Sequence, residues 1–407
     1  MRRMTDSGNQ LDTQSKPALR RGEISILLGT RGRPEMLADV FGSLQKNTSL
    51  KDKVAIWLYV DEDDSVTRQA IDRKTLPDPG VGLHWHIGPQ VGDLGEMHRV
   101  LWQATGRASE IYMVSVDDAR FDTPGWDEIV RKQFAEYPDG AVLAFPHDPM
   151  TADVATYPIF GWKWLATLGC VFPGYFPYWF DDKWVTEIGL LVGRRLKLPI
   201  VLFPIRGKGR TKRMRNLAFW TRFFQLTIQE RKAAAHKLLT IMHPQGSPAH
   251  AAAVAHLEKV AVELASEQEN YSDIYCTFQE ERHTEMTPGE RRAFDAKYFK
   301  QEALAVSRLA SFAEAAAAAG KFTEAMEYLD ATHLSDLRVR RVQYLKAECL
   351  QKLGQTAEAA RLEREALAAW PEHNALRRLF RFLGMVANDG KRMLVGLTAK
   401  GRSGKKS

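Results

Sequence analysis

The sequence contains few cysteines, and they are not paired. Cys170, Cys276 and Cys349 are the three cysteines of a 407-residue chain, and they lie far apart. Such spacing argues against a disulfide framework and against a structural zinc site. Because unpaired cysteines are typical of a reducing compartment, the sequence predicts a cytoplasmic protein.

Long hydrophobic runs are also missing. Apolar residues make up 44% and charged residues 26% of the chain, close to the usage of soluble proteins, and no apolar run approaches the ~20 residues needed to span a bilayer. Residues 1–21 carry positive charges without a following apolar segment, so they do not resemble a secretory signal. We expect a disordered leader there and no transmembrane segment.

Several common catalytic signatures are absent as well. The sequence has no Walker A motif, no zincin helix and no Gly-x-Ser-x-Gly elbow, which leaves ATPase, metalloprotease and serine hydrolase functions without support. Residues 29–34 superficially resemble the glycine-rich loop of sugar-nucleotide pyrophosphorylases, but they lack its further glycines and its lysine. A nucleotidyltransferase would require that loop.

The basic residues are unevenly distributed. The chain has 57 Lys and Arg against 50 Asp and Glu, and two stretches without any acid, residues 206–215 and 391–407, hold most of the excess. Such stretches are usually solvated surfaces or tails, and the alternative is contact with phosphates, with nucleic acid or with another anionic surface. Both interpretations stay open.

Residues 23–205 alternate short β-branched or apolar runs with helical patterns. This alternation is typical of βαβ units around a mostly parallel sheet, so the predicted fold class is α/β. Pro34 suits the first turn of a helix over residues 34–44, and a second helix is expected over residues 95–105. Strands are predicted at residues 23–28, 54–60, 82–87, 111–116 and 141–145.

Alanine-rich helical patterns replace the strands after residue 213, and the last third contains an internal repeat. Ala313, Gly320, Glu324 and Ala325 recur 34 residues later as Ala347, Gly354, Glu358 and Ala359, followed by Ala366 and Pro371. This is the tetratricopeptide period, which predicts stacked helical repeats and a groove for a partner protein. A helical bundle with chance periodicity is the alternative.

These patterns divide the chain into five expected parts. They are a leader over residues 1–21, an α/β domain over 22–213, a helical extension over 214–300, helical repeats over 301–386 and a basic flexible tail over 387–407.

Polar residues follow three of the predicted strands. The first strand is followed by Thr30 and Arg31, the second by Asp61, and the fourth by Asp117 and Asp118. Open α/β sheets bind ligands at the carboxyl ends of their strands. Adjacent carboxylates at a strand end repel each other unless a cation compensates, and Mg²⁺ or Mn²⁺ bridging a diphosphate is a natural compensator. An ordinary strand-to-turn junction is the alternative for the aspartate pair.

The segment Met113-Val-Ser-Val-Asp-Asp-Ala-Arg-Phe-Asp-Thr-Pro-Gly-Trp-Asp127 resembles the metal-binding motif and following turn of GT-A glycosyltransferases of the inverting family-2 type. Residues 24–37 resemble the first strand and helix of that family, and the likeness extends over residues 23–205. It implies that Thr30 and Arg31 line the nucleotide pocket and that Asp61 contacts the base or ribose. Asp117 would then lie at the ribose, and Asp118 would hold Mn²⁺ or Mg²⁺ on the sugar diphosphate.

The same resemblance implies an acceptor side in residues 169–184. Asp182, with Asp181 as the fallback, falls where the family has its catalytic aspartate, and an inverting transfer needs one carboxylate to deprotonate the acceptor hydroxyl. Aromatic residues of this stretch are candidates to stack on an acceptor, with core packing as the alternative. They are Tyr175, Tyr178, Trp179 and Trp184.

Two features depart from the family pattern. The later histidine that often completes the metal site is missing, since no histidine follows residue 198 until His236, and metal dependence therefore stays open. Arg206 and Lys208 begin the basic stretch at that place and are candidates to neutralise the diphosphate. The family's asparagine before the fourth strand is missing too, and Arg99 is the nearest candidate for a donor contact.

The sequence therefore predicts a glycosyltransferase that moves a sugar from a nucleotide diphosphate donor to an acceptor hydroxyl. The acceptor, whether glycan, protein or modified nucleic acid, stays open. The alternative is a non-catalytic adaptor whose helical repeats bind a partner protein.

Overall fold

A computed structural model of the chain describes residues 18–91, 94–148, 153–177, 179–205, 216–276, 288–335 and 337–369. The chain divides into two compact units, Met1–Gln301 and Glu302–Ser407. The first unit contains both the predicted α/β domain and the predicted helical extension.

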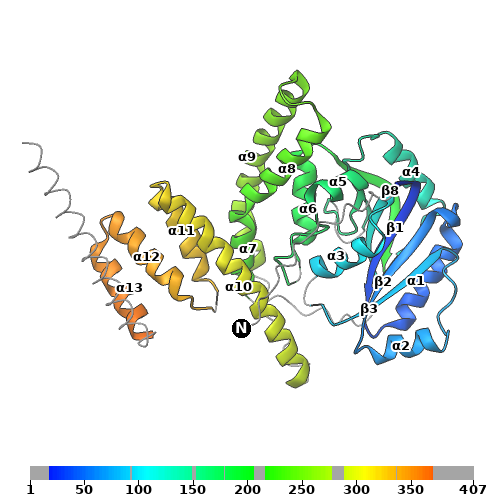
Figure 1. Cartoon of the computed structure of the whole chain (residues 1–407), viewed down its shortest axis with the longest axis horizontal. Coiled ribbons are helices and arrows are strands. Elements are labelled where there is room, and N and C mark those ends of the chain that lie inside the picture. Colours follow the sequence, from blue (N-terminus) through cyan, green and yellow to red (C-terminus); the bar gives the residue numbers. More distant parts are fainter. Residues whose placement is uncertain are drawn as a thin grey trace, which may run out of the picture. The chain divides into compact units, whose positions relative to one another are not determined.

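The described residues of the first unit form an eight-stranded mixed sheet in the order β3-β2-β1-β4-β7-β6-β8-β5 (Figure 1). The strands are β1 (Arg20–Thr30), β2 (Val54–Asp61), β3 (Gly82–Gly88), β4 (Ser109–Val116), β5 (Ala119–Phe121), β6 (Leu143–His147), β7 (Ile159–Gly161) and β8 (Arg195–Pro204). Neighbours pair in parallel except that β7 runs against β4 and β6, and β5 against β8. The five predicted strands are present, and three strands are additional, namely the three-residue strands β5 and β7 and the ten-residue strand β8.

Helices cover both faces of this sheet. They are α1 (Pro34–Asn47), α2 (Ser65–Asp72), α3 (Leu94–Ala104), α4 (Trp126–Ala135), α5 (Trp162–Leu168) and α6 (Asp181–Leu191), with a short 3-10 turn at Lys51–Lys53. Apolar residues of α1 and α4 pack in one cluster with Ile24 and Ile26 of β1, whereas Gly29 meets Met97 of α3 on the other face. A side chain at Gly29 would overlap the Met97 sulfur, which fixes how closely α3 approaches the sheet.

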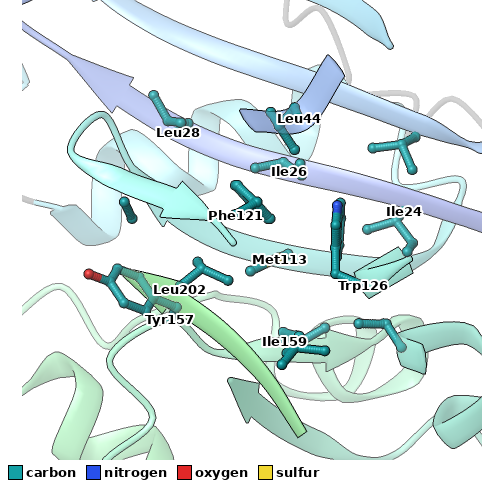
Figure 2. Packing of buried hydrophobic residues seen from close by; sticks show 14 of the residues in the cluster. Ile24, Ile26, Leu28, Leu44, Met113, Phe121, Trp126, Tyr157, Ile159 and Leu202 are labelled. Atoms are coloured by element: carbon teal, nitrogen blue, oxygen red, sulfur yellow. The ribbon is translucent and has the colours of Figure 1, made fainter. Parts of the chain in front are cut away.

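The main core lies between the sheet and α1 and α4. Figure 2 shows part of it, with Phe121 and Trp126 between residues of β1 and β4. Tyr157 lies at the margin of this cluster with its hydroxyl directed away from the other labelled residues (Figure 2). Burying large apolar side chains of this kind contributes about 1.5–3 kcal/mol each, so this core can hold the polar strand ends in place.

Three further helices belong to the first unit. They are α7 (Leu217–Leu226), α8 (Ile228–Met242) and α9 (Pro248–Cys276). Phe223 and Phe224 of α7 pack against Phe176 in the segment before α6, and Glu187 of α6 forms an ion pair with Arg231 of α8. These helices therefore pack against the segment before α6 and against α6 itself.

The second unit contains paired helices that follow the 34-residue repeat. Helix α10 (Pro288–Ala318) extends into it and is followed by α11 (Phe322–Thr332), α12 (Arg340–Lys352) and α13 (Thr356–Ala369). Gly320 and Gly354 both adopt positive φ angles, +77° and +81°, two residues before the first residues of α11 and α13. The repeated alanines Ala313, Ala347, Ala325 and Ala359 are all buried.

The equivalent positions thus have equivalent structural roles, and a tetratricopeptide identity stays a prediction. Pro371 and the basic tail over residues 387–407 lie outside the described residues. In the part of the chain that the structure describes, no helix combines the length and the apolar character required to cross a membrane. The predicted fold class, a mostly parallel α/β domain followed by helices, is confirmed.

Candidate active site

The turn between β1 and α1 directs two arginines towards different acidic strand ends. Gly32 has a φ of +65°, and its N–H donates to Asp64 Oδ2 at 2.8 Å and to Thr67 Oγ1 at 3.2 Å. The turn is thereby attached to the loop that follows β2. Arg31 and Arg33 on either side of this glycine reach the acids after β2 and after β4, respectively.

Arg31 binds acids at the end of β2 and just after it. Its Nη1 donates to Asp61 Oδ2 at 2.7 Å, and its two terminal nitrogens contact the two oxygens of Asp63 at 2.6 and 2.8 Å. The Arg31 hydrogen bond lowers the pKa of Asp63, whereas burial raises the pKa of Asp61 in spite of the arginine. Arg31 and Asp61 are therefore brought together, and their role in one donor-binding site stays a prediction.

Asp117 is fully buried at the end of β4. Thr30 Oγ1 donates to its Oδ2 at 2.8 Å, Arg33 Nε donates to the same oxygen at 3.1 Å, and Arg33 Nη2 contacts its Oδ1. Burial raises its pKa to about 6, although Arg33 and Thr30 oppose the rise. Because burying a charge is costly without such partners, Thr30 and Arg33 compensate for the position of Asp117.

We expect the raised pKa of Asp117 to appear in the pH dependence of stability. The folded-state pKa of Asp117 lies above its ordinary value, so the folded state holds this proton more tightly than the unfolded state. The stability that the proton confers is fully present below pH 4 and is lost as the pH rises through 6. From pH 4 to 7 the free energy of unfolding of the wild type should fall by up to about 3 kcal/mol relative to Asp117→Asn. Urea unfolding of both proteins in EDTA measures this difference, and parallel pH profiles would contradict the assignment.

Asp118 follows Asp117 but is half-exposed. Arg33 Nη1 donates to its Oδ2 at 3.2 Å, and its backbone carbonyl accepts the N–H of Ile205 at 2.5 Å. Ile205 directly follows β8, so the end of that strand is fixed beside Asp118. The next residues in the chain include the predicted donor contacts Arg206 and Lys208, which lie outside the described residues.

Two residues that the sequence analysis did not select lie in the same electrostatic environment. Asp148 directly follows β6 and is buried, and its charge raises the pKa values of Tyr157 and Asp182. The charge of Asp118 also raises the pKa of Tyr157, after burial and Asp148. Burial is the larger cause of both rises. The rule that selected Asp117, an acid directly after a strand, also applies to Asp148.

Asp181 and Asp182 form the first turn of α6, where carboxylates interact favourably with the helix dipole. Trp179 and Phe180 precede them with φ angles of 54° and 60°. Asp181 is buried, and Asp182 is half-buried with Oδ1 accepting the Lys183 N–H at 2.8 Å. Burial is the main cause that raises the pKa of Asp182.

Most of the described acceptor-side aromatics take part in core packing. Trp184 is 6% exposed and packs against Phe176 and the guanidinium of Arg231. Tyr175 contacts the ring of Trp184 edge to face, and its hydroxyl donates to Glu230 Oε1 at 3.2 Å. Trp179 is exposed, and Tyr178 lies outside the described residues. For Trp184 and Tyr175 the packing favours the core alternative.

Arg99 and its neighbour His98 lie on α3. Arg99 donates to Glu96 one turn earlier, with Nε 2.7 Å from Oε2. His98 is buried against Phe172, and burial lowers its pKa to about 4, so the ring is neutral at pH 7. The role of Arg99 as a donor contact stays a prediction.

The side chains around the β1–α1 turn carry a net negative charge that a bound cation would balance. Five aspartates, Asp61, Asp63, Asp64, Asp117 and Asp118, meet two arginines there, an excess of three negative charges among these seven side chains. Within the described ranges, no group of three or more His, Cys, Asp or Glu side chains is arranged to hold a metal ion. The half-exposed Asp118 carboxylate nevertheless fits a Mg²⁺ or Mn²⁺ ion that takes its other ligands from phosphate and water.

Comparison with known proteins adds structural relatives only. No protein family matches the chain, and no curated protein does. S. aureus TarS 1-349 in complex with UDP-GlcNAc is 10% identical, with 85% of this chain and 92% of that chain covered and a TM-score of 0.46.

Two further structures have lower scores. The mannosyltransferase PcManGT from Pyrobaculum calidifontis, in complex with GDP-Man and Mn²⁺, is 14% identical over 88% and 90% of the two chains, with a TM-score of 0.38. A cytidylyltransferase from Leptospira borgpetersenii is 13% identical over 55% and 98%, with a TM-score of 0.32. At these identities and scores the likeness carries no argument about activity, which has to be judged from the residues.

Proposed function

We propose that the α/β part of the chain is a GT-A-type glycosyltransferase that transfers a sugar from a nucleotide diphosphate donor to an acceptor hydroxyl with inversion. The observation that carries the proposal is the meeting of Arg31, Asp61, Asp117 and Asp118 around one turn at the carboxyl edge of the sheet. This edge is where open α/β sheets bind nucleotides.

The donor side follows from the chemistry of these groups. Asp61 keeps hydrogen-bonding capacity for a ribose or base, because only one of its oxygens is engaged by Arg31. Asp118 would hold Mn²⁺ or Mg²⁺, which would neutralise the diphosphate as it leaves. Ile205 donates its N–H to the carbonyl of Asp118. Arg206 and Lys208 come next in the sequence and are proposed to contact the same diphosphate.

The acceptor side is assigned to the beginning of α6. Asp182 is the proposed general base, and Asp181 is the fallback. A raised pKa improves a carboxylate as a base at neutral pH, and burial together with the charge of Asp148 provides that rise for Asp182. The exposed Trp179 is the described aromatic that is best placed to contact an acceptor.

Donor binding can be tested by thermal unfolding with a panel of nucleoside diphosphate sugars, each with Mn²⁺, Mg²⁺ or EDTA. A ligand at 100 times its Kd adds about 2.7 kcal/mol to the free energy of unfolding, so a specific donor should raise the melting temperature. Asp118→Ala should abolish the Mn²⁺-dependent part of this rise while the protein stays folded.

Asp122→Ala is the matched control, because Asp122 is a nearby aspartate whose arginine partner, Arg120, is exposed. It should bind the donor as the wild type does. If no donor raises the melting temperature, the proposal is rejected, and the adaptor function of the helical repeats, with a partner protein or nucleic acid, becomes the one to test.

A further inference from the structure

Arg33 places a guanidinium on the proposed metal ligand Asp118 and on its neighbour Asp117. Its Nε and Nη2 contact the two oxygens of Asp117, and its Nη1 donates to Asp118 Oδ2 at 3.2 Å. One planar side chain thus engages three carboxylate oxygens on two adjacent residues. A fork of fixed N–H donors suits this arrangement, whereas a single ammonium does not.

The backbone holds Arg33 in place from both sides. Its carbonyl accepts the N–H of Leu37 at 3.1 Å in the first turn of α1, and Pro34 fixes the start of that helix. On the other side, Gly32 is attached to Asp64 and Thr67. The fold therefore fixes the backbone of Arg33, from which the side chain reaches both acids.

The two halves of the contact differ in strength. Asp117 is fully buried and is engaged through Nε and Nη2, whereas Asp118 is about one-third exposed and is engaged through Nη1 alone. Water competes with the contact to Asp118 but not with the contact to Asp117. The contact between Arg33 and Asp118 is therefore the one that another cation can replace.

We propose that Arg33 is the counter-cation of the ligand-free site and competes with the divalent cation for Asp118. When the cation binds, Nη1 leaves Asp118 while Nε and Nη2 stay on Asp117. The guanidinium lowers the affinity for the cation, both by occupying Asp118 and by its charge, and the cation weakens the Arg33–Asp118 contact by the same factor. The inference rests on the proposed function only in taking Asp118 as the metal ligand.

The test measures Mn²⁺ binding to the metal-free full-length chain, without donor, from the electron paramagnetic resonance signal of free Mn²⁺. Arg33→Gln should bind Mn²⁺ about tenfold more tightly than the wild type, since a partly exposed charge-assisted contact and one repulsive charge are removed. Arg33→Lys should lie between the two. Asp118→Asn in the Arg33→Gln background should abolish the gain.

Arg31→Gln separates competition from general electrostatics. It removes the same charge from the same turn, but Arg31 contacts Asp61 and Asp63 instead of Asp118. Its Mn²⁺ affinity should change much less than that of Arg33→Gln. Equal gains in both variants, or unchanged or weaker binding by Arg33→Gln, would overturn the inference.

A second measurement uses the wild type in case Arg33→Gln does not fold by circular dichroism. In ¹⁵N-arginine-labelled protein, the Nε–H resonance that is lost in Arg33→Lys should shift on Mg²⁺ titration. An unmoved resonance would contradict the exchange, and so would the failure of every variant to bind Mn²⁺. Neither result affects the donor test in EDTA, so failure here is distinct from failure of the proposed function.

Discussion

Asp182→Asn is expected to reduce sugar transfer by about 10³-fold, because a general base in this position contributes 10²–10⁴-fold to the rate. The amide keeps the shape of the side chain, and its oxygen can still accept the N–H of Lys183. Donor binding should therefore be unchanged. Single-turnover transfer measured with a saturating donor, together with donor affinity from thermal unfolding, separates the two effects.

Asp181→Asn is the matched control, since both aspartates lie in the first turn of α6. If Asp181→Asn loses transfer and Asp182→Asn keeps it, the role of base belongs to Asp181. Normal turnover in both variants would remove this helix from the chemistry.

The pH dependence of transfer gives a further check on the same residue. A base acts in its ionised form, so the rate should be full above the raised pKa of Asp182 and should fall as the pH drops through it. The charge of Asp148 contributes to that rise. Asp148→Asn should therefore move the acidic limb of the kcat/KM profile slightly to lower pH, because burial remains as the main cause of the rise, and a limb that moves to higher pH would remove Asp182 as its source.

The sequence predicts five of the eight described strands and most of the acids at the carboxyl edge of the sheet. Strands such as residues 54–60 are recognised by their apolar pattern, and the acid after each strand follows from the rule that parallel strands end at one edge. Asp148 obeys the same rule, but the strand before it was expected to end at residue 145, two residues earlier than β6 does. The position of a strand end decides which polar residue is selected.

The partners of the acids were harder to predict. Arg33 directly precedes Pro34 at the start of α1. An arginine at such a position looks, from the sequence, like an ordinary surface residue. The contact of Arg33 with Asp117 and Asp118 depends on the pairing of β1 with β4, which places residues more than 80 positions apart in direct contact. Similarly, the burial of Trp184 depends on contacts with Phe224 of α7 and Arg231 of α8, which lie about 40 or more positions later in the sequence.

Arg231→Ala is expected to lower the free energy of unfolding by about 3–5 kcal/mol, because it leaves a buried carboxylate without its partner. The guanidinium of Arg231 is fully buried between α6 and α8, with Nε 2.7 Å from Glu187 Oε2 and Nη1 2.8 Å from the Phe224 carbonyl oxygen. It also lies over the ring of Phe224, at 4.0 Å from the centroid. Because Glu187 lies on the helix that begins with Asp181, the same change should loosen the proposed acceptor side.

Two comparisons identify the cause of this loss. Lys232→Ala removes the next cation on α8, whose partner Glu258 is largely exposed, and should cost less than about 1 kcal/mol. Arg231→Met combined with Glu187→Leu should recover most of the stability lost in Arg231→Ala, since apolar side chains often replace a buried ion pair without loss. Urea unfolding of the four proteins tests both expectations. A double variant as unstable as Arg231→Ala would show that the hydrogen bonds to the end of α7, and not the lost ion pair with Glu187, dominate the effect.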